Sequence, residues 1–498
     1  MSIIDDEKKF EVVQNEVMSD GVDSIIDDRL KVEFPASLAA LTAEELAALD
    51  RATTRKVDIL LMPTLLTLYT LNYLDRNNLQ MAKIGGMTTD LGMTSTQYAT
   101  CVSVLFAGYV SLQVPSNMIA SRLSRPGSYI CFMCGLWGAV SACTGAVKSY
   151  AGLAVCRTVL GFTEAAFFVG ALYLLSTFYT KAQLALRTSI LYSGLQLGNA
   201  FGGLFALAVF NLDGAHHIAG WRWLFIVEGA LTVGAAFVFA GFIPNTPKTI
   251  RWLTPLERDQ LVYRLAEDFG SYHEPGPFWP SVRLALTDVK MWLLLLCMLL
   301  NAITSAATNF FALIIDSLGF NRSTTLPLTV PPYILCMAVI LAYSWHSDKK
   351  QERALHIAIP YAIVIAANII AMATTNTAAR YFAMMLMPSA FYAPAVIVYS
   401  WMSTSITGTS TKRATAMALI NASANTPSIW TSYLYSGHEP HYYAAFSVNI
   451  AASLLAIVFA VATGQYLKKL NSRLDKGEDL GPQGPTEVQK RAGFRFVA

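Results

Sequence analysis

Long apolar runs separated by short polar turns fill most of the chain. A helix needs about 20 residues to cross a hydrocarbon core of about 30 Å, and twelve runs reach that length. A polar segment, 244–287, separates the sixth run from the seventh. The pattern predicts an all-α membrane protein whose twelve transmembrane helices form two six-helix bundles, 57–243 and 288–468. The expected spans are 57–82, 97–120, 127–147, 151–178, 183–211, 221–243, 288–318, 324–346, 354–374, 379–404, 413–437 and 442–468.

Three polar segments flank the predicted bundles. Residues 1–56 form an acidic tail, in which Thr42-Ala-Glu-Glu45 is a capping-box pattern that predicts a short surface helix. In the linker 244–287, Thr254-Pro255-Leu256-Glu257 combines a helix N-cap, a proline at the first helical position and a capping-box glutamate. We therefore expect an amphipathic helix over about 255–267. Residues 469–498 form the second tail.

Composition and charge agree with a membrane protein. Hydrophobic residues make up 54% of the chain and charged residues only 14%, whereas a soluble domain carries about 25% charged residues. The net charge of +3 divides into −9 for residues 1–50 and +12 for the rest. Basic residues concentrate in alternate loops, and loops rich in lysine and arginine face the cytoplasm. We therefore expect a multi-pass protein of the plasma membrane with both termini in the cytoplasm.

Several function classes lack the residues that they need. The seven cysteines all fall in apolar segments, where they suit helix packing better than metal or redox chemistry. No nucleophile–base pair or metal cluster stands out among the seven histidines, and no G-x-x-x-x-G-K-[ST] phosphate loop is present. We therefore expect neither an enzyme nor an ATP-driven pump, and a monomer in the lipid bilayer with no cofactor and no nucleic-acid partner.

Charged residues continue the first predicted span. Its apolar stretch, Ile59–Leu74, reaches only about 24 Å as a helix. The helix must therefore continue within the membrane through Asp75-Arg76-Asn77-Asn78. An intramembrane charge is a hypothesis for a functional site. Helical spacing places four side chains on one face: Tyr69, Asn72, Tyr73 and Arg76.

The fourth span carries a second set of buried charges. Arg157 and Glu164 lie seven residues apart and share a face, and Gly161 between them permits close helix packing. In one interpretation these acids and arginines neutralise one another as a structural network. In the other, an arginine holds a substrate anion while an acid takes up and releases a proton. Burial opposes ionisation of a carboxyl group, a guanidinium favours it, and an anion entering between them changes that balance.

Other polar residues inside the spans could line the same cavity, or could only join helices by hydrogen bonds. They are Tyr109, Gln196, Asn301, Asn309, Asn421 and Asn425. Glu228 in the sixth span and Asp316 near the end of the seventh are weaker candidates for proton transfer, because no intramembrane cation faces either at helical spacing.

Six segments together resemble the major facilitator superfamily. Within it, the chain is most similar to the anion:cation symporter branch and to fungal allantoate, nicotinate and pantothenate permeases. The resemblance covers about 55–470 and implies the twelve-helix fold. The matching segments are Leu71-Asn-Tyr-Leu-Asp-Arg-Asn-Asn78, Gly108-Tyr-Val-Ser-Leu-Gln-Val-Pro-Ser-Asn117, Arg157-Thr-Val-Leu-Gly-Phe-Thr-Glu-Ala165, Gly220-Trp-Arg-Trp-Leu-Phe-Ile-Val-Glu-Gly229, Ser347-Asp348 to Arg353, and Lys412-Arg-Ala414.

The resemblance also implies roles for single residues. In related bacterial sugar-acid symporters, the acid at Asp75 acts in proton coupling and the arginine at Arg76 binds the substrate carboxylate. The fourth-span motif implies that Glu164 is the second protonatable group, beside Arg157. Family positions of the second, fifth and eleventh spans match Tyr109, Gln196 and Asn421. We therefore predict proton coupling at Asp75, Glu164 and Arg157, and substrate binding by Arg76, Tyr73, Tyr109, Gln196, Asn309 and Asn421.

A cytoplasmic gate is implied at Asp348, Lys349 and Arg353, with Arg187 as a further member. Two positions depart from the branch pattern. Gln183 stands where an acid is usual, which weakens one gate contact to Arg187, and Ala166 replaces a glycine, which changes the local helix shape.

These features predict a proton-coupled secondary transporter that imports a small organic anion by alternating access. The substrate is expected to be a carboxylate resembling a vitamin or a ureide. Two alternatives remain at this stage: an exporter of an acidic metabolite on the same fold, and a sensor that binds an anion without transporting it.

Overall fold

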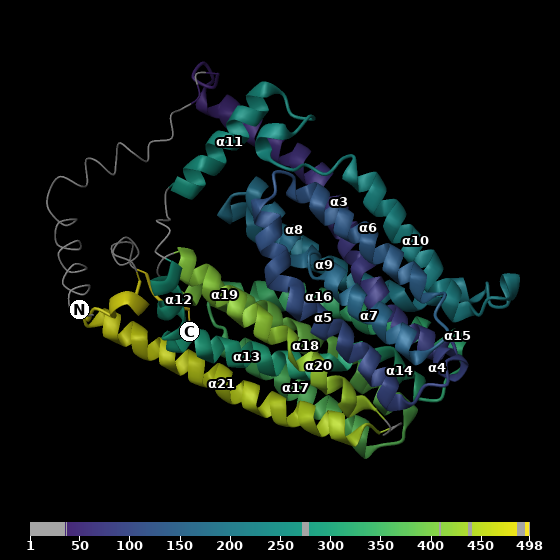
Figure 1. The fold of residues 1–498 in the computed structure, drawn as a ribbon. Coiled ribbons are helices and arrows are strands. Elements are labelled where there is room, and N and C mark those ends of the chain that lie inside the picture. The colour runs from purple at the N-terminus through teal and green to yellow at the C-terminus, as the bar shows by residue number, and fades with distance from the viewer. Residues whose placement is uncertain are drawn as a thin grey trace, which may run out of the picture.

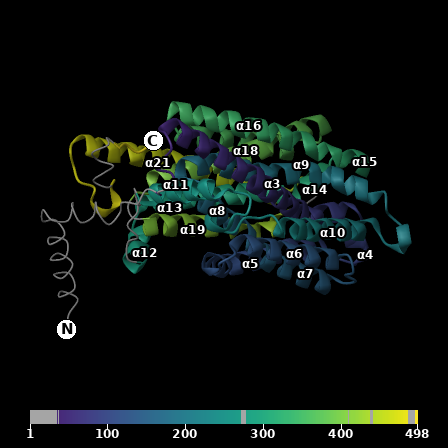
Figure 2. The ribbon, with the colours of Figure 1, turned by 90° about the horizontal axis from the view of Figure 1, so that it is seen from above.

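The computed structural model of the chain is helical throughout the part that it describes, which is residues 35, 37–270, 278–407, 410–436, 441–485 and 494–497. Most of the predicted acidic tail, 1–34, lies outside the described residues. The helices run side by side, and two groups of them lie on either side of a central plane (Figure 1). A view turned by 90° shows the same long helices stacked in parallel layers (Figure 2).

The first group, called the N-terminal bundle below, contains six spans. Its helices are α3 (Ala43–Ile84), the short α4 (Met87–Asp90), α5 (Ser95–Arg122), α6 (Pro126–Thr144), α7 (Tyr150–Glu164), α8 (Phe167–Phe178), α9 (Lys181–Phe210) and α10 (Gly220–Ala240). Helices α7 and α8 together form the fourth span. The main pairs within this bundle are α3 with α9, α5 with α7, and α6 with α10.

The second group, called the C-terminal bundle below, contains the other six spans, several of them interrupted. The helices are α13 (Val289–Ser305), η3 (Ala306–Phe310), α14 (Phe311–Asp316), α15 (Arg322–Thr325), η4 (Pro327–Thr329), α16 (Val330–Lys350), α17 (Ala354–Ala373), α18 (Thr377–Ser405), α19 (Ser410–Asn425), α20 (Pro427–Thr431), η5 (Ser432–Tyr435) and α21 (Tyr443–Asp475). Among the described residues, ten spans qualify as membrane-crossing by length and hydropathy. The element order adds α5 and α19–η5, so the prediction of twelve spans in two bundles is confirmed.

Local sequence signals set many helix starts. The Thr42 hydroxyl accepts a hydrogen bond from the amide of Glu45, and the Glu45 carboxylate accepts one from the amide of Thr42. Thr94 and Gln97 form the same capping box at the start of α5. Proline occupies the first turn of α6 and of α16, where its missing amide hydrogen has no helical partner to lose.

Glycines allow the closest helix contacts. A Cβ atom on Gly161 of α7 would lie 2.1 Å from the backbone oxygen of Leu105 in α5. One on Gly198 of α9 would lie 2.6 Å from Cβ of Tyr73 in α3. The expected packing role of Gly161 is therefore confirmed, and it holds α7 closely against α5.

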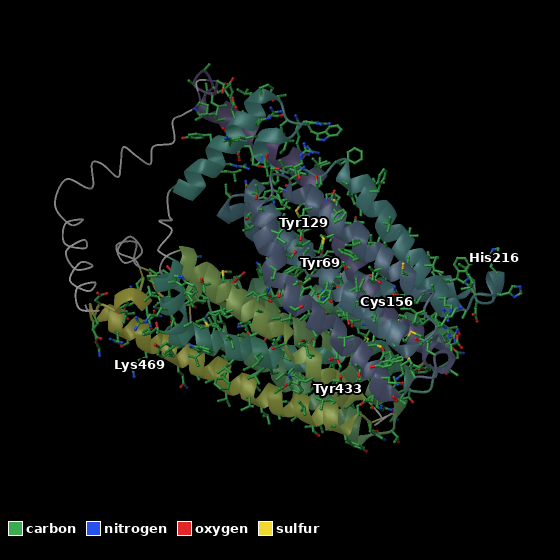
Figure 3. The ribbon with its side chains drawn as sticks, viewed as in Figure 1. Tyr69, Tyr129, Cys156, His216, Tyr433 and Lys469 are labelled. Carbon is green, nitrogen blue, oxygen red and sulfur yellow. The ribbon has the colours of Figure 1, made fainter. Side chains whose placement is uncertain are left out.

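The two ends of the molecule differ. Helices α11 (Pro255–Gly270) and α12 (Phe278–Leu286) lie at one end, called the α11 end, and α4 and α15 lie at the other, called the α4 end (Figure 1). The two bundles lie close together at the α4 end and diverge toward the α11 end (Figure 1). The loop with His216, between α9 and α10, projects beyond the α4 end (Figure 3).

The flanking segments differ from the sequence expectation in two ways. Among the residues from 37 on, no separate surface helix precedes the first span, because α3 runs unbroken from Ala43 to Ile84 and the expected boundary at residue 56 falls inside it. No glycine or proline interrupts 43–62, so nothing ends the helix there. The linker contains α12 in addition to the expected amphipathic helix α11, whose capping box at Thr254 and Glu257 is formed.

Helix α11 is tied to the start of α3 by ion pairs. Lys56 Nζ lies 2.7 Å from the Glu257 carboxylate, and Arg264 Nη1 lies 2.6 Å from the Asp50 carboxylate. Arg264 also donates to the hydroxyl of Thr54 at 2.7 Å. The α11 part of the linker thus packs on the N-terminal bundle, whereas α12 contacts α19 of the C-terminal bundle.

The C-terminal segment packs on the C-terminal bundle. The side chain of Asn471 in α21 donates to the carbonyl of Phe496 and accepts from its amide, at 2.8 and 2.9 Å. The indole of Trp401 in α18 donates to the carbonyl of Val497 at 2.7 Å. Lys290 Nζ of α13 lies 4.6 Å from the centre of the Phe496 ring. Residues 494–497 therefore contact three helices of this bundle.

Candidate functional site

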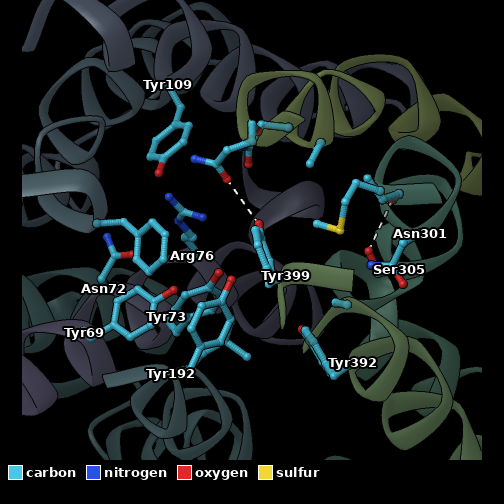
Figure 4. Close-up of a pocket in the computed structure, with 18 of the residues that line it drawn as sticks. Tyr69, Asn72, Tyr73, Arg76, Tyr109, Tyr192, Asn301, Ser305, Tyr392 and Tyr399 are labelled. Carbon is cyan, nitrogen blue, oxygen red and sulfur yellow. Dashed lines mark hydrogen bonds between the residues drawn. The ribbon is translucent and has the colours of Figure 1, made fainter. Parts of the chain in front are cut away.

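A polar cavity of about 140 Å³ lies between the two bundles near the middle of the spans (Figure 4). Helices α3, α5, α7, α8 and α9 form one wall, and α13, α18 and α19 form the other. It is lined by Tyr69, Asn72, Tyr73, Arg76, Tyr109, Glu164, Phe168, Tyr192, Leu195, Met298, Asn301, Ala302, Ser305, Tyr392, Ala395, Tyr399, Asn421, Ala424 and Asn425.

Arg76 and Glu164 form an ion pair in this cavity. Arg76 Nε donates to Glu164 Oε2 at 2.6 Å, and the Glu164 side chain is fully buried. The guanidinium carbon lies 5.3 Å from the centre of the Tyr73 ring and 4.7 Å from that of Tyr109, within the range of cation–π attraction. Figure 4 shows Arg76 held between these two rings. The other carboxylate oxygen of Glu164 has no hydrogen-bond partner among the described residues.

Aromatic rings make up much of the cavity wall. Tyr69 stacks on Phe168 with ring centres 5.5 Å apart and meets Tyr73 edge to face at 5.1 Å. Tyr192 of α9 and Tyr399 of α18 approach each other across the two bundles with ring centres 6.2 Å apart. Such a wall offers flat faces and phenolic hydroxyl groups to a planar ligand.

The wall from the C-terminal bundle is polar but carries no charge. It presents Asn301, Ser305, Tyr392, Asn421 and Asn425. The Tyr399 hydroxyl donates to the side-chain oxygen of Asn421 at 3.2 Å. Among the described lining residues, Arg76 is the only lysine or arginine and Glu164 the only acid. The cavity as built therefore pairs one positive with one negative charge.

A hydrogen-bonded network crosses between the bundles on the α4 side of Arg76. Asn77 donates to Asn199 of α9 at 2.7 Å, and Gln80 donates to Asn77 at 2.8 Å. The Gln80 side-chain oxygen accepts from the backbone amide of Ala312 in α14 at 3.0 Å. Asn199 also donates to the Tyr392 hydroxyl of α18 at 3.4 Å. Helices α3 and α9 are thus linked to α14 and α18.

Two further hydrogen bonds join the bundles at the α4 end. The Ser103 hydroxyl donates to the carbonyl of Ile429, and the Tyr433 hydroxyl, at the tip of the C-terminal bundle in Figure 3, donates to Thr100 at 3.3 Å. Helices α5 and α20 therefore join the bundles at this end.

Not all predicted site residues lie in the cavity. Arg76, Tyr73, Tyr109, Asn421 and Glu164 line it. Gln196 is buried in α9 beside the lining residue Leu195, and does not itself line the cavity. Asn309 and Arg157 line a much smaller space of about 10 Å³ on the far side of Arg76. The binding roles predicted for Gln196 and Asn309 stay predictions.

Asp75 lies behind the cavity rather than in it. Its carboxylate accepts a hydrogen bond from Ser141 of α6 at 2.5 Å, and only 1% of the residue is exposed. Because Asp75 and Arg76 are neighbours on α3, they point in different directions: Arg76 faces the cavity and Asp75 faces α6.

The predicted gate residues form pairs within each bundle. Arg353 lies 2.6 Å from the Asp348 carboxylate, and Lys349 Nζ lies 5.1 Å from the centre of the Trp345 ring. Arg187 pairs with Asp58 of α3 at 2.7 Å. The family pattern leads one to expect an acid at position 183 as the partner of Arg187, but that position is Gln183 and Asp58 supplies the acid instead. Sequence reasoning did not identify Asp58, although its place at the start of the first span was a signal.

Sequence reasoning also missed part of the aromatic wall. Tyr192 of α9 and both Tyr392 and Tyr399 of α18 line the cavity from two spans that contain none of the six matching segments. A tyrosine inside an apolar span was the only signal for each, and helical periodicity alone does not say which face meets the other bundle.

Comparisons with known proteins agree with the fold. A family profile described as Major Facilitator Superfamily matches residues 65–431. An uncharacterised transporter of Schizosaccharomyces pombe is 30% identical over 84% of this chain and 84% of the relative. The high-affinity nicotinic acid transporter of Saccharomyces cerevisiae is 28% identical over 90% of this chain and 85% of that protein. A bacterial homologue of the human lysosomal transporter Spinster, solved in an inward-facing and unoccupied conformation, shares the fold, with a TM-score of 0.61, 17% identity, and coverage of 82% of this chain and 95% of that chain.

Proposed function

Because the chain belongs to the Major Facilitator Superfamily, we propose that this multi-pass membrane protein is a proton-coupled secondary transporter of the anion:cation symporter branch. It imports a small organic anion by alternating access, with protons as the coupling ion. The single observation that supports this best is the buried pair of Arg76 and Glu164 in a cavity between the two bundles.

Competition for one guanidinium supplies the coupling. A substrate carboxylate that binds Arg76 must displace Glu164 from it. The displaced Glu164 would be a buried carboxylate without a cation, which is strongly unfavourable until it takes up a proton. Substrate binding and protonation of Glu164 therefore favour each other. Conversely, release of the substrate lets Glu164 return to Arg76 and lose its proton.

The charges in the cavity favour a monoanion. With Glu164 protonated, Arg76 leaves one positive charge, which one carboxylate neutralises. The opposite wall offers only amide and hydroxyl groups, so a second negative charge would be buried without a partner. One proton therefore accompanies one monocarboxylate, and the transport step is electroneutral.

The size and lining of the cavity favour a compact planar substrate. Its volume of about 140 Å³ is small beside the roughly 300–1,000 Å³ of sites for drug-sized ligands. Tyrosine rings and neutral amides suit a ring or ureide group attached to the carboxylate. That one relative is a nicotinic acid transporter supports a vitamin-like carboxylate.

The remaining predicted residues have supporting roles in this scheme. Asp75 and Arg157 contribute to proton coupling from behind the cavity. The α11 end faces the cytoplasm, and in the opposite state the gate residues Asp348, Lys349, Arg353 and Arg187 would meet across the bundles at that end. The plasma membrane is the proposed location.

The proposal is tested by transport in liposomes that contain the purified protein. Radiolabelled nicotinate, pantothenate, biotin, allantoate and dicarboxylates are offered with and without an inward proton gradient. We expect accumulation of a monocarboxylate that collapses with a proton ionophore, and no accumulation of dicarboxylates.

Two variants test the mechanism. Arg76→Ala should abolish substrate binding, whereas Arg55→Ala, which removes an exposed arginine of the same helix, should not. Glu164→Gln should abolish proton-driven accumulation but retain counterflow exchange of the substrate. If Arg76→Ala accumulates substrate as the native protein does, the assigned anion site is wrong.

A further inference from the structure

We infer that Asp75 and Glu228 form a buried carboxylic acid–carboxylate pair between α3, α6 and α10, which holds one exchangeable proton outside the substrate cavity. The pair adds Glu228 to the groups that carry protons during transport. Its part in transport depends on the proposed function, whereas the shared proton does not.

Contacts from three helices place the two carboxyl groups at one interface. Ser141 of α6 donates to Asp75 Oδ1, and Asn78 of α3 donates to Glu228 Oε2 of α10. Asp75 and Asn78 lie three residues apart on α3, so they share a helical face. Because Asn78 bonds Glu228, the Glu228 carboxyl group lies beside the face of α3 that carries Asp75.

Both carboxyl groups are excluded from solvent. Asp75 is 1% exposed and Glu228 is 0% exposed. The second oxygen of each, Asp75 Oδ2 and Glu228 Oε1, is buried without a hydrogen-bond partner among the described residues. A buried oxygen without a partner is uncommon and points to an unaccounted proton or ligand.

An unpartnered hydroxyl lies at the same interface. Thr232 is one helical turn after Glu228 on α10, is 1% exposed, and its hydroxyl has no partner among the described residues. Its Cβ atom would lie 2.9 Å from a Cβ added to Gly138, which precedes Ser141 by one turn on α6. The interface therefore contains three unsatisfied oxygens, each able to bind a proton or accept from a hydroxyl.

The charges of the two carboxyl groups and of their neighbours determine whether a proton is held at this interface. Two ionised carboxylates in an apolar interior repel each other, and each loses several kcal/mol or more of hydration. No cation of the described residues forms an ion pair with Glu228; α6 contains no charged residue and the stretch of α9 at 193–210 contains no ionisable one. The charged groups that act on the pair are Glu164 of α7 on both members, and Arg157 and Arg76 on Asp75.

One proton resolves this imbalance. With one of the two carboxyl groups protonated, the pair carries one negative charge rather than two. That remaining charge lies outside the cavity, on the side of α3 that faces α6, and Asp75 directly precedes Arg76 in the chain. When a substrate displaces Glu164 from Arg76, the electrostatic field at Asp75 changes. The affinity of the pair for the shared proton changes with it.

Infrared difference spectra of the purified protein between acidic and alkaline pH, without substrate, test the shared proton directly. We expect a carbonyl band of a buried carboxylic acid that titrates with pH and disappears in Glu228→Gln and in Asp75→Asn. Glu257→Gln is the matched control, because Glu257 lies in α11 outside the spans. A band that persists unchanged in both Glu228→Gln and Asp75→Asn overturns the inference.

Transport tests whether the proton moves. Glu228→Gln should lower the accumulation reached in a gradient of one pH unit by up to about tenfold, the factor for one coupled proton, while counterflow exchange, which reports correct folding, continues. Unchanged accumulation overturns the role of Glu228 in transport. If the native protein shows no proton-driven accumulation at all, the proposed function fails, and the infrared band still decides whether the pair holds a proton.

Discussion

Gln80→Leu should open the α4 end of the protein. The Gln80 side chain is the only described partner that crosses from α3 to the backbone of α14, where it accepts the amide hydrogen of Ala312. Ala312 is the second residue of α14, and amides in a first helical turn have no partner within their own helix. Gln80 thus caps a helix of the opposite bundle, and this cap exists only while the two bundles are in contact.

The expected magnitude follows from the burial of both groups. Leucine has nearly the volume of glutamine but accepts no hydrogen bond, so the amide of Ala312, which is 1% exposed, would be left unpaired. An unpaired buried donor costs about 1–3 kcal/mol. The bond from Gln80 to Asn77 would be lost as well. A change of about 1–3 kcal/mol shifts a two-state equilibrium by about 5–150-fold, away from the state described here.

Distances between spin labels measure this shift. Labels at Thr89 of α4 and Ser323 of α15, both exposed, report the separation of the bundles at the α4 end in a background without the native cysteines. We expect Gln80→Leu to raise the population with a long distance. Gln465→Leu, an exposed position on α21, is the matched control. If the distance distribution of Gln80→Leu equals that of the control, the cap does not hold the bundles together.

Three further predictions concern stability. Gly161→Ala should lower the unfolding temperature strongly, because its methyl group would lie 2.1 Å from a backbone oxygen of α5; a thermal unfolding scan checks this. Although burial opposes it, the hydrogen bond from Lys56 lowers the pKa of Glu257. The pair therefore stabilises the fold by about 0–1 kcal/mol above the ordinary pKa of 4.5, and this stabilisation is lost as the pH falls. The unfolding temperature of Lys56→Met should accordingly be lower than that of the native protein near neutral pH but equal to it at acidic pH. Asn471→Ala removes two hydrogen bonds to Phe496, which destabilises the packing of that segment by about 1–2 kcal/mol. Hydrogen exchange should therefore show the amide of Phe496 exchanging about tenfold faster.

The sequence by itself determined the secondary structure, the number of spans and the separation into two bundles. These features depend on local order: apolar runs of membrane length, proline and capping residues at helix starts, and a polar linker between two sets of six runs. Thr42 and Glu45 cap a helix as their spacing predicts. The sequence also predicted that four charged residues lie inside the membrane, because the spans that carry them must cross it at these positions: Asp75, Arg76, Arg157 and Glu164.

The tertiary structure alone decided which of these residues meet. The Arg76–Glu164 bond joins residues 88 positions apart, and the Gln80–Ala312 bond joins residues 232 positions apart. Helical periodicity assigns a side chain to a face but not that face to a neighbour. This is why Asn309 and Arg157 line a separate small space, why Asp58 replaces the expected partner of Arg187, and why Tyr192, Tyr392 and Tyr399 were not foreseen. The close helix contacts at Gly161 and Gly198, together with the joining of the bundles at one end, set these neighbours and so define the cavity.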